Sequence, residues 1–281
     1  MQIFVTRQEL NNWRQQMRAE QQQIGFVPTM GALHQGHLSL VHQACAANDF
    51  VVVSIFVNPK QFNQSADLQS YPRMLEADLA LLSSLRNIVI FAPDEQEMYP
   101  KDLPYHPMPL GRIGSVLEGS HRPGHFEGVV HVVHHLFAIV QPLKAYFGQK
   151  DYQQLAIIRQ LNTFYGFGIE IIGCPTVRET DGLAMSSRNL RLSAQERQNA
   201  VSISRALHFI KTNAGQISID EVKNEAISII ETAGLVLEYL EIVDPNTLEN
   251  CSEWQAAQVC CVAALCGEVR LIDNMLCESV L

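Results

Sequence analysis

Residues 24–37 have the sequence IGFVPTMGALHQGH and carry the strongest local signal of the fold. Its apolar start, Ile24 to Pro28, predicts a short strand that ends in a turn. A loop with two glycines follows, and a helix is expected to begin near His37 and to cover Leu38 to Ala47. A helix start presents N–H groups and positive dipole to an anion. The stretch therefore predicts a strand, a phosphate-binding loop and a helix, in that order.

Strand-like and helix-like stretches keep alternating up to about residue 175. Phe50 to Val57 is rich in β-branched residues and apolar on both faces, which predicts a buried parallel strand. Further strands are expected at 88–92, 144–148 and 169–173, and further helices at 75–85, 129–140 and 153–165. This alternation predicts an α/β, Rossmann-like parallel sheet. Ligands of such sheets bind beyond the carboxyl ends of the strands.

The pattern changes after about Pro175. Ser193 and Glu196 form a capping-box pattern that predicts a helix start, and a second helix is expected from Asp220 to Ala233. Strand-like runs follow at 237–243 and 259–264. We therefore expect a Rossmann-like domain over residues 1–176 and a smaller α+β C-terminal domain over residues 177–281.

Composition excludes several classes of protein. The chain has 281 residues, of which 47% are apolar, so it can bury a large core and is not disordered. A formal charge of −9 disfavours nucleic acid as a partner. No apolar run reaches the roughly 18 residues of a membrane span, and no secretory leader is visible, so we expect a cytoplasmic protein without a membrane partner. The seven cysteines lack a C-x-x-C pair and are expected to be reduced and buried.

Two histidines open the predicted helix. His34 and His37 lie three residues apart, so both can project to one side and donate hydrogen bonds to phosphate oxygens. Gly36 lets a ligand approach the backbone closely. The alternative is that one histidine caps the helix and the other lies at the surface.

Two more polar turns directly follow predicted strands. In the first, Lys150 is a candidate phosphate contact and Asp151 a candidate for ribose hydroxyls, unless the turn is an ordinary helix N-terminus. In the second, Asn58 and Gln61 offer amides that bind hydroxyl and carboxylate groups without adding charge.

Two loops carry further candidates. Ser186, Ser187 and Arg188 can bind phosphate oxygens, and the guanidinium of Arg188 can donate to two phosphate oxygens at once. Arg122 can neutralise an anionic ligand. Either loop, taken alone, can also be simply solvated. A helical set of three histidines has zinc-ligand spacing but no H-E-x-x-H, which favours an ordinary packed helix; these are His131, His134 and His135.

Seven segments in this order resemble the pantoate–β-alanine ligase (pantothenate synthetase) family from residue 1 to 281. They are PTMGALHQGH, VVVSIFVNPKQF, DLQSYPRMLEAD, LEGSHRPGHFEGV, FGQKDYQQLAIIRQL, CPTVRETDGLAMSSRN and VRLIDN. This family belongs to the nucleotidyltransferases with H-x-G-H sites. The resemblance implies that ATP and (R)-pantoate give pantoyl-adenylate and pyrophosphate with Mg²⁺, and that β-alanine then gives pantothenate and AMP.

The resemblance also implies site residues. Catalytic roles fall to His37 as proton donor and to His34, Lys150 and Arg188. ATP contacts are expected from Met30, Gly31, Ala32, Leu33, His34, Gln35, Gly36, His37, Gly148, Gln149, Lys150, Asp151, Val177, Met185, Ser186, Ser187 and Arg188. Pantoate contacts are expected from Gln61, Gln154, Asn58 and Arg122, and β-alanine contacts from Gln61. Mg²⁺ is expected to arrive with ATP, near Asp78, without a tight protein site, and no tightly bound organic cofactor is expected. A homodimer is implied, with the C-terminal domain acting as a lid.

Four positions depart from the family pattern without removing a ligand-binding group: Met74, Glu127, His135 and Gln149. Three other hypotheses for the function are a nucleotidyltransferase that adenylates another acid, a non-catalytic nucleotide-binding regulator and a zinc hydrolase. A tRNA-handling relative is disfavoured, because the chain is short and acidic. The resemblance to the family implies that four side chains converge on the triphosphate of ATP: His34, His37, Lys150 and Arg188.

Overall fold

The computed structural model describes residues 1–63 and 65–278 and forms two compact units. The sheet unit comprises Met1–Gly114, Arg122–Gly148 and Gln154–Cys174. The C-terminal unit comprises Ser115–His121, Gln149–Gln153 and Pro175–Leu281. Two short segments of the first 174 residues therefore group with the C-terminal unit.

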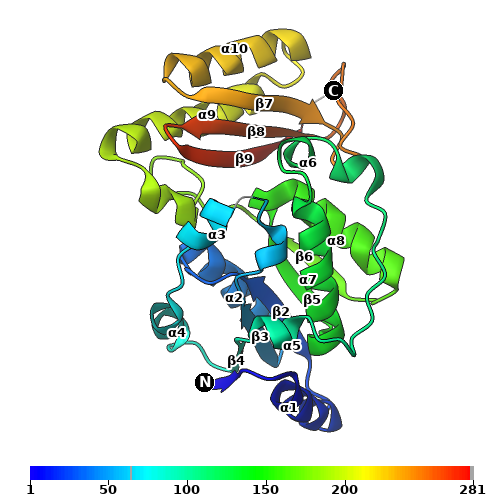
Figure 1. Ribbon diagram of the computed structural model, residues 1–281. Coiled ribbons are helices and arrows are strands. Elements are labelled where there is room, and N and C mark those ends of the chain that lie inside the picture. Colours follow the sequence, from blue (N-terminus) through cyan, green and yellow to red (C-terminus); the bar gives the residue numbers. More distant parts are fainter. Residues whose placement is uncertain (64, 279–281) are drawn as a thin grey trace. The chain divides into compact units, whose positions relative to one another are not determined.

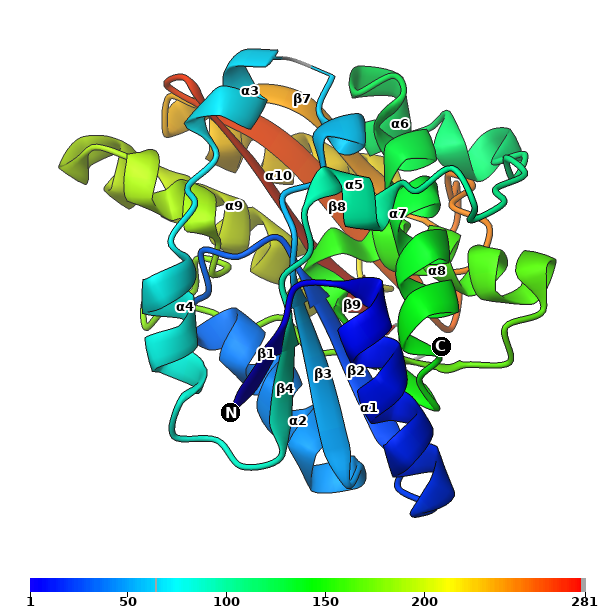
Figure 2. The ribbon, with the colours of Figure 1, turned by 60° about the horizontal axis from the view of Figure 1, so that its bottom comes forward.

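Six parallel strands form the sheet of the sheet unit, in the order β1-β4-β3-β2-β5-β6. They are β1 (Gln2–Phe4), β2 (Ile24–Thr29), β3 (Phe50–Ile55), β4 (Ile88–Phe91), β5 (Lys144–Gly148) and β6 (Glu170–Cys174). Figure 2 shows β1, β4, β3 and β2 side by side. The chain continues from β2 to β3 on one side, whereas β5 lies on the other. The loop after β2 is therefore at the switch point where such sheets bind ligands.

Helices cover both faces of this sheet. The unit's helices are α1 (Arg7–Ala19), α2 (Gln35–Ala47), α3 (Ser65–Ser70), α4 (Leu75–Leu82), α5 (Glu95–Met98), α7 (His125–Val140) and α8 (Tyr152–Tyr165), the last beginning in residues 149–153. One core contains side chains of α1, α7 and α8 against the sheet. The other contains side chains of α2 and α4 against the opposite face. The predicted Rossmann-like fold is confirmed.

The C-terminal unit pairs two helices with an antiparallel sheet (Figure 1). Strands β7 (Val236–Val243), β8 (Gln258–Cys266) and β9 (Val269–Cys277) lie in that order, and α9 (Ala194–Asn213) and α10 (Ile219–Thr232) share a core with them. The short α6 (Glu118–His121) also belongs to this unit. Ser193 caps α9 with the expected capping box. The predicted smaller α+β fold is confirmed, although the sequence did not predict β9.

Within residues 1–63 and 65–278, no helix combines the length and the apolar character that a membrane span requires.

Candidate functional site

The H-x-G-H loop connects β2 to α2. Helix α2 begins at Gln35, two residues before the predicted start, because the side chain of His34 acts as its N-cap. His34 Nδ1 accepts a hydrogen bond from the Gly36 N–H at 3.1 Å, and His37 Nδ1 accepts one from the His34 N–H at 3.3 Å. The predicted helix is confirmed and begins two residues before His37, since His34 itself supplies the cap that an Asp or Ser usually provides.

These two contacts fix the protonation pattern of the rings. A ring nitrogen that accepts an N–H carries no proton, so the neutral imidazole has its proton on Nε2. Both His34 and His37 can therefore donate from Nε2. Their ring centroids lie 4.1 Å apart. Capping and donation are thus compatible roles for His34.

A buried carboxylate shapes the loop before these histidines. Asp78 on α4 is 2% exposed, and its two oxygens accept the N–H groups of Leu33 at 2.7 Å and Ala32 at 3.0 Å. Gly31 and Ala32 both have positive φ, 82° and 51°. A Cβ on Gly31 would lie 2.9 Å from Asp78 Oδ2, so glycine is required there.

An amide cluster follows β3, the neighbour of β2. Asn58 caps the 3-10 helix η1 (Pro59–Gln61) and is 1% exposed. Its Nδ2 donates to Gln61 Oε1 at 3.0 Å and to the Gly128 carbonyl at 3.1 Å, while its Oδ1 accepts the Tyr99 hydroxyl at 2.6 Å. Both Asn58 amide hydrogens thus serve the protein, and Asn58 orients Gln61.

Gln61 connects the amide cluster to the H-x-G-H loop. Its Nε2 lies 3.0 Å from Met30 Sδ, and the residue is 9% exposed. Helix α7 packs closely against η1, because a Cβ on Gly128 would lie 2.2 Å from the Lys60 carbonyl oxygen. The structure therefore brings the turns after β2 and β3 into contact, as their order in the sheet predicts.

Arg122 is held by a histidine that the sequence analysis did not single out. His125 Nδ1 donates to the Gln61 carbonyl at 2.8 Å, and Arg122 donates from Nη1 to His125 Nε2 at 3.1 Å. This pattern defines a neutral His125 with its proton on Nδ1. The only local signal was the spacing H-R-P-G-H, which does not reveal a contact with a residue 64 positions away.

The remaining candidates of the sheet unit lie on or next to β5. Gly148 ends this strand, and Gln154 lies in the first turn of α8 with a partly exposed side chain.

The C-terminal unit carries the other predicted ATP contacts. Gln149, Lys150 and Asp151 form the 3-10 helix η3 (Gln149–Asp151), with Lys150 Nζ 4.0 Å from Asp151 Oδ1. Met185 donates its N–H to the Val177 carbonyl at 3.0 Å, which closes a hairpin.

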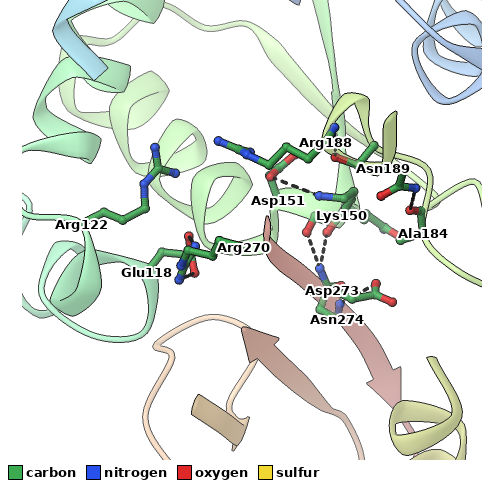
Figure 3. A network of polar contacts seen from close by, with 12 residues as sticks. Glu118, Arg122, Lys150, Asp151, Ala184, Arg188, Asn189, Arg270, Asp273 and Asn274 are labelled. Atoms are coloured by element: carbon green, nitrogen blue, oxygen red, sulfur yellow. Dashed lines mark hydrogen bonds and ion pairs between the residues drawn. The ribbon is translucent and has the colours of Figure 1, made fainter. Parts of the chain in front are cut away.

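The outgoing arm of that hairpin leads to the predicted phosphate donors. Ser186 caps the 3-10 helix η4 (Ser187–Arg191), since its Oγ accepts the Arg188 N–H at 3.2 Å. Asn189 Nδ2 donates to the Ala184 carbonyl at 3.0 Å (Figure 3). Short-range hydrogen bonds therefore fix the backbone that carries Ser187 and Arg188.

The histidines of α7 form an aromatic cluster. His131 stacks on Tyr105 at 3.9 Å, and His135 Nδ1 donates to the Met98 carbonyl at 2.6 Å. Burial lowers the pKa of His131 and of His134 to about 4. Across the described ranges, no three His, Cys, Asp or Glu side chains are grouped to hold a metal ion. These contacts are those of a packed helix.

A parallel sheet with an H-x-G-H loop at its switch point and an amide cluster after the next strand defines an α/β protein suited to a phosphate-bearing ligand. The family model described as pantoate-beta-alanine ligase matches residues 2–276. The chain therefore belongs to the pantoate–β-alanine ligase family. The resemblance inferred from the sequence is confirmed, and with it an enzyme of the ligase class.

Individual relatives agree with the family model. Pantothenate synthetases of Bacteroides thetaiotaomicron and Phocaeicola vulgatus are 48% and 50% identical, over 98% of this chain and 98% and 99% of theirs. The crystal structure of pantothenate synthetase from Thermus thermophilus has a TM-score of 0.91 at 44% identity, covering 98% of this chain and 99% of that one. The Francisella tularensis ligase, complexed with beta-gamma ATP and beta-alanine, has a TM-score of 0.82 at 38% identity, with coverage of 98% and 97%. ATP-dependent condensation of pantoate with β-alanine is the activity of this family.

Proposed function

We propose that this chain condenses (R)-pantoate with β-alanine in two steps, through pantoyl-adenylate. The pantoate carboxylate attacks the α-phosphorus of ATP and displaces pyrophosphate. The amine of β-alanine then attacks the acyl carbon and releases AMP, giving pantothenate. Family membership supports the overall reaction, and the contacts described above support the assignment of residues to each step.

The H-x-G-H loop is proposed to bind the phosphates of ATP. The observation that carries this proposal is the pair of Nδ1-accepting histidines, because it directs both ring protons to Nε2, where they can be donated to phosphate oxygens. We assign the proton-donor role to His37 and a second donor role to His34. Further ATP contacts in this loop are Met30, Gly31, Ala32, Leu33, Gln35 and Gly36.

The C-terminal unit is proposed to act as a lid that supplies more donors to the same nucleotide. Lys150 and Arg188 are assigned to phosphate oxygens, and Asp151 to the ribose hydroxyls. Gly148, Gln149, Val177, Met185, Ser186 and Ser187 complete this set. Charge that develops on phosphate oxygens during in-line attack requires fixed donors rather than a protein nucleophile.

Pantoate is proposed to bind at the amide cluster. Gln61 and Gln154 contact its hydroxyl and carboxylate groups, and Gln61 also helps place β-alanine. Arg122, oriented by His125, balances the negative charge of the acid. Because both Asn58 amide hydrogens already serve protein acceptors, we propose that Asn58 contributes to pantoate binding by orienting Gln61.

Mg²⁺ is proposed to enter with ATP, since magnesium in such enzymes is held largely by substrate phosphates and water. Asp78 contacts the H-x-G-H loop, where its two carboxylate oxygens accept the Ala32 and Leu33 N–H groups. We further propose a homodimer and a cytoplasmic location; the seven cysteines, all free thiols, fit a reducing compartment.

The experiment that tests this proposal compares His37→Ala and Lys150→Ala with wild type in an AMP-forming assay. Loss of one well-aimed donor typically lowers turnover by about 10²–10³, and we expect that loss in both variants. His42→Ala is the matched control, because His42 lies on the same helix as His37 but is exposed. Wild-type turnover of His37→Ala contradicts the assignment.

Two outcomes separate the alternatives. Pyrophosphate release with a different acid, and none with pantoate, would indicate another adenylating enzyme. ATP binding without any AMP in the presence of all three substrates would indicate a nucleotide-binding regulator.

A further inference from the structure

Strand β9 carries two polar residues at buried positions. Asp273 is 4% exposed and Asn274 is 6% exposed, although both lie within a strand of the C-terminal unit. Burying a carboxylate and an amide costs free energy unless hydrogen bonds satisfy them. Their partners therefore indicate why two buried positions of this strand carry polar side chains.

Asn274 holds the turn that carries Lys150. Its Nδ2 donates to the Gln149 carbonyl at 2.9 Å and to the Lys150 carbonyl at 2.6 Å, so both amide hydrogens are used. Figure 3 shows this side chain pointing from β9 to two oxygens of the turn. The contact fixes the main chain of η3 and does not involve Lys150 Nζ.

Asp273 holds the hairpin that leads to Arg188. Its carboxylate accepts Arg178 Nη1 at 2.6 Å and Arg178 Nη2 at 3.0 Å, a bidentate pair. Arg178 Nη1 also donates to the Gly182 carbonyl at 3.1 Å, and Arg178 pairs with Ala184 across the hairpin. The ion pair therefore ties both arms of the hairpin to β9.

The two anchoring residues, Asp273 and Asn274, also share hydrogen bonds. The Asn274 N–H donates to Asp273 Oδ1 at 2.8 Å, and Arg178 Nη2 donates to the Asn274 carbonyl at 3.2 Å. A shift of either anchor thus changes the hydrogen bonds of the other. One dipeptide of β9 consequently fixes two segments that are distant from each other in the sequence.

We propose that Asp273 and Asn274 are positioning residues for ATP activation, which act through Lys150 and through the Ser186–Arg188 segment. The proposal rests on the proposed function, because it assumes that these segments contact ATP. Neither Asp273 nor Asn274 is assigned a substrate contact. A donor misplaced by about 1 Å can lower a rate by about 10²-fold, so the anchors matter for turnover without touching the nucleotide.

A double-mutant cycle tests the link between Asn274 and Lys150. We expect Asn274→Ala to lower kcat/KM for ATP by about 30–100-fold and to change KM for β-alanine by less than about threefold. If Asn274 acts through Lys150, Asn274→Ala adds less than about threefold to the loss in Lys150→Ala. Single-turnover pyrophosphate release keeps the slow variants measurable.

A matched control separates positioning from general packing. Gln258 on β8 is fully buried, and its Nε2 donates to the Glu253 carbonyl at 2.9 Å, in a loop outside the proposed site. We expect Gln258→Ala to lower the melting temperature while it leaves kcat/KM for ATP within about threefold. An equal loss of kcat/KM in Gln258→Ala overturns the positioning role.

Asn274→Asp provides a variant of unchanged volume. The ionised carboxylate of this variant would place an acceptor against two carbonyl oxygens, whereas the protonated acid regains one donor. We therefore expect its activity, relative to wild type, to recover as the pH falls; a pH profile parallel to that of wild type contradicts the proposal.

The outcomes also separate this proposal from the proposed function. Wild-type protein that forms no AMP rejects the function itself. An active wild type in which the effects of Asn274→Ala and Lys150→Ala multiply, or in which Lys150→Ala is harmless, rejects only the positioning role.

Discussion

Replacement of Asp78 by Asn is expected to loosen the H-x-G-H loop. The buried carboxylate accepts two backbone N–H groups, from Leu33 at 2.7 Å and Ala32 at 3.0 Å. An asparagine retains one acceptor oxygen, while its NH₂ group faces the second N–H. The change therefore removes one charge-assisted hydrogen bond and leaves a buried donor unsatisfied.

The magnitude follows from these two losses. A hydrogen bond to a charged group contributes about 1.5–3 kcal/mol, and an unsatisfied buried donor costs about 1–3 kcal/mol. We expect the free energy of opening the loop to fall by about 3 kcal/mol, which corresponds to a protection factor about 100-fold lower for the Ala32 and Leu33 amides. Hydrogen exchange of a peptide that spans Met30 to His34 measures this change.

Asp49→Asn is the matched control. Asp49 also accepts a backbone N–H, that of Gln23 at 2.7 Å, but its side chain is exposed and water can replace the bond. We expect less than about 1 kcal/mol there. Unchanged loop protection in Asp78→Asn, together with a raised Mg²⁺ requirement, would refute the anchoring role and indicate a metal ligand.

Three further predictions follow from burial and packing. Gly128→Ala would put a methyl group against the Lys60 carbonyl, so we expect KM for pantoate to rise about tenfold or more, measured by steady-state kinetics. The pKa of His131 and of His134 falls to about 4 on folding, from about 6.5 in the unfolded chain, so the unfolded chain binds more protons between these two pH values. Chemical unfolding should therefore show the free energy of unfolding decreasing as the pH falls from 6.5 to 4. The same free energy should depend less on pH in His134→Gln. A thiol reagent should modify the two partly exposed cysteines first and the others only on unfolding; those two are Cys45 and Cys251.

The main elements of the fold could be predicted because their residues carry strong local signals. The β-branched run at Phe50 to Ile55 and the capping box of α9 predict structure without knowledge of tertiary contacts. β1 escaped prediction because three residues are too few to show a period. Helix α1 was missed although its sequence carries a local signal, a capping box of Thr6 and Glu9 followed by Leu10, Trp13 and Met17 at helical spacing.

Most contacts that the sequence did not predict join residues far apart in the chain, and the cap of helix α2 by His34 is the local exception. The N-cap role of His34 was considered only as an alternative to donation, whereas the ring can do both. Residues 115–121 group with the C-terminal unit through Glu118, which accepts Arg270 Nη1 and Nη2 at 2.7 and 2.6 Å across 152 residues of sequence. The partners of Asn274 lie 125 and 124 positions away in the sequence. No local pattern specifies such pairs.

Pyrophosphate exchange into ATP measures the adenylate step alone, and therefore shows whether the H-x-G-H loop forms pantoyl-adenylate. With purified protein, ATP, Mg²⁺ and labelled pyrophosphate, label should enter ATP only when pantoate is added, without any need for β-alanine, and the exchange should be about 10²–10³ slower in His37→Ala. Exchange that is independent of pantoate, or that proceeds at the wild-type rate in His37→Ala, would contradict an acyl-adenylate formed at the H-x-G-H loop.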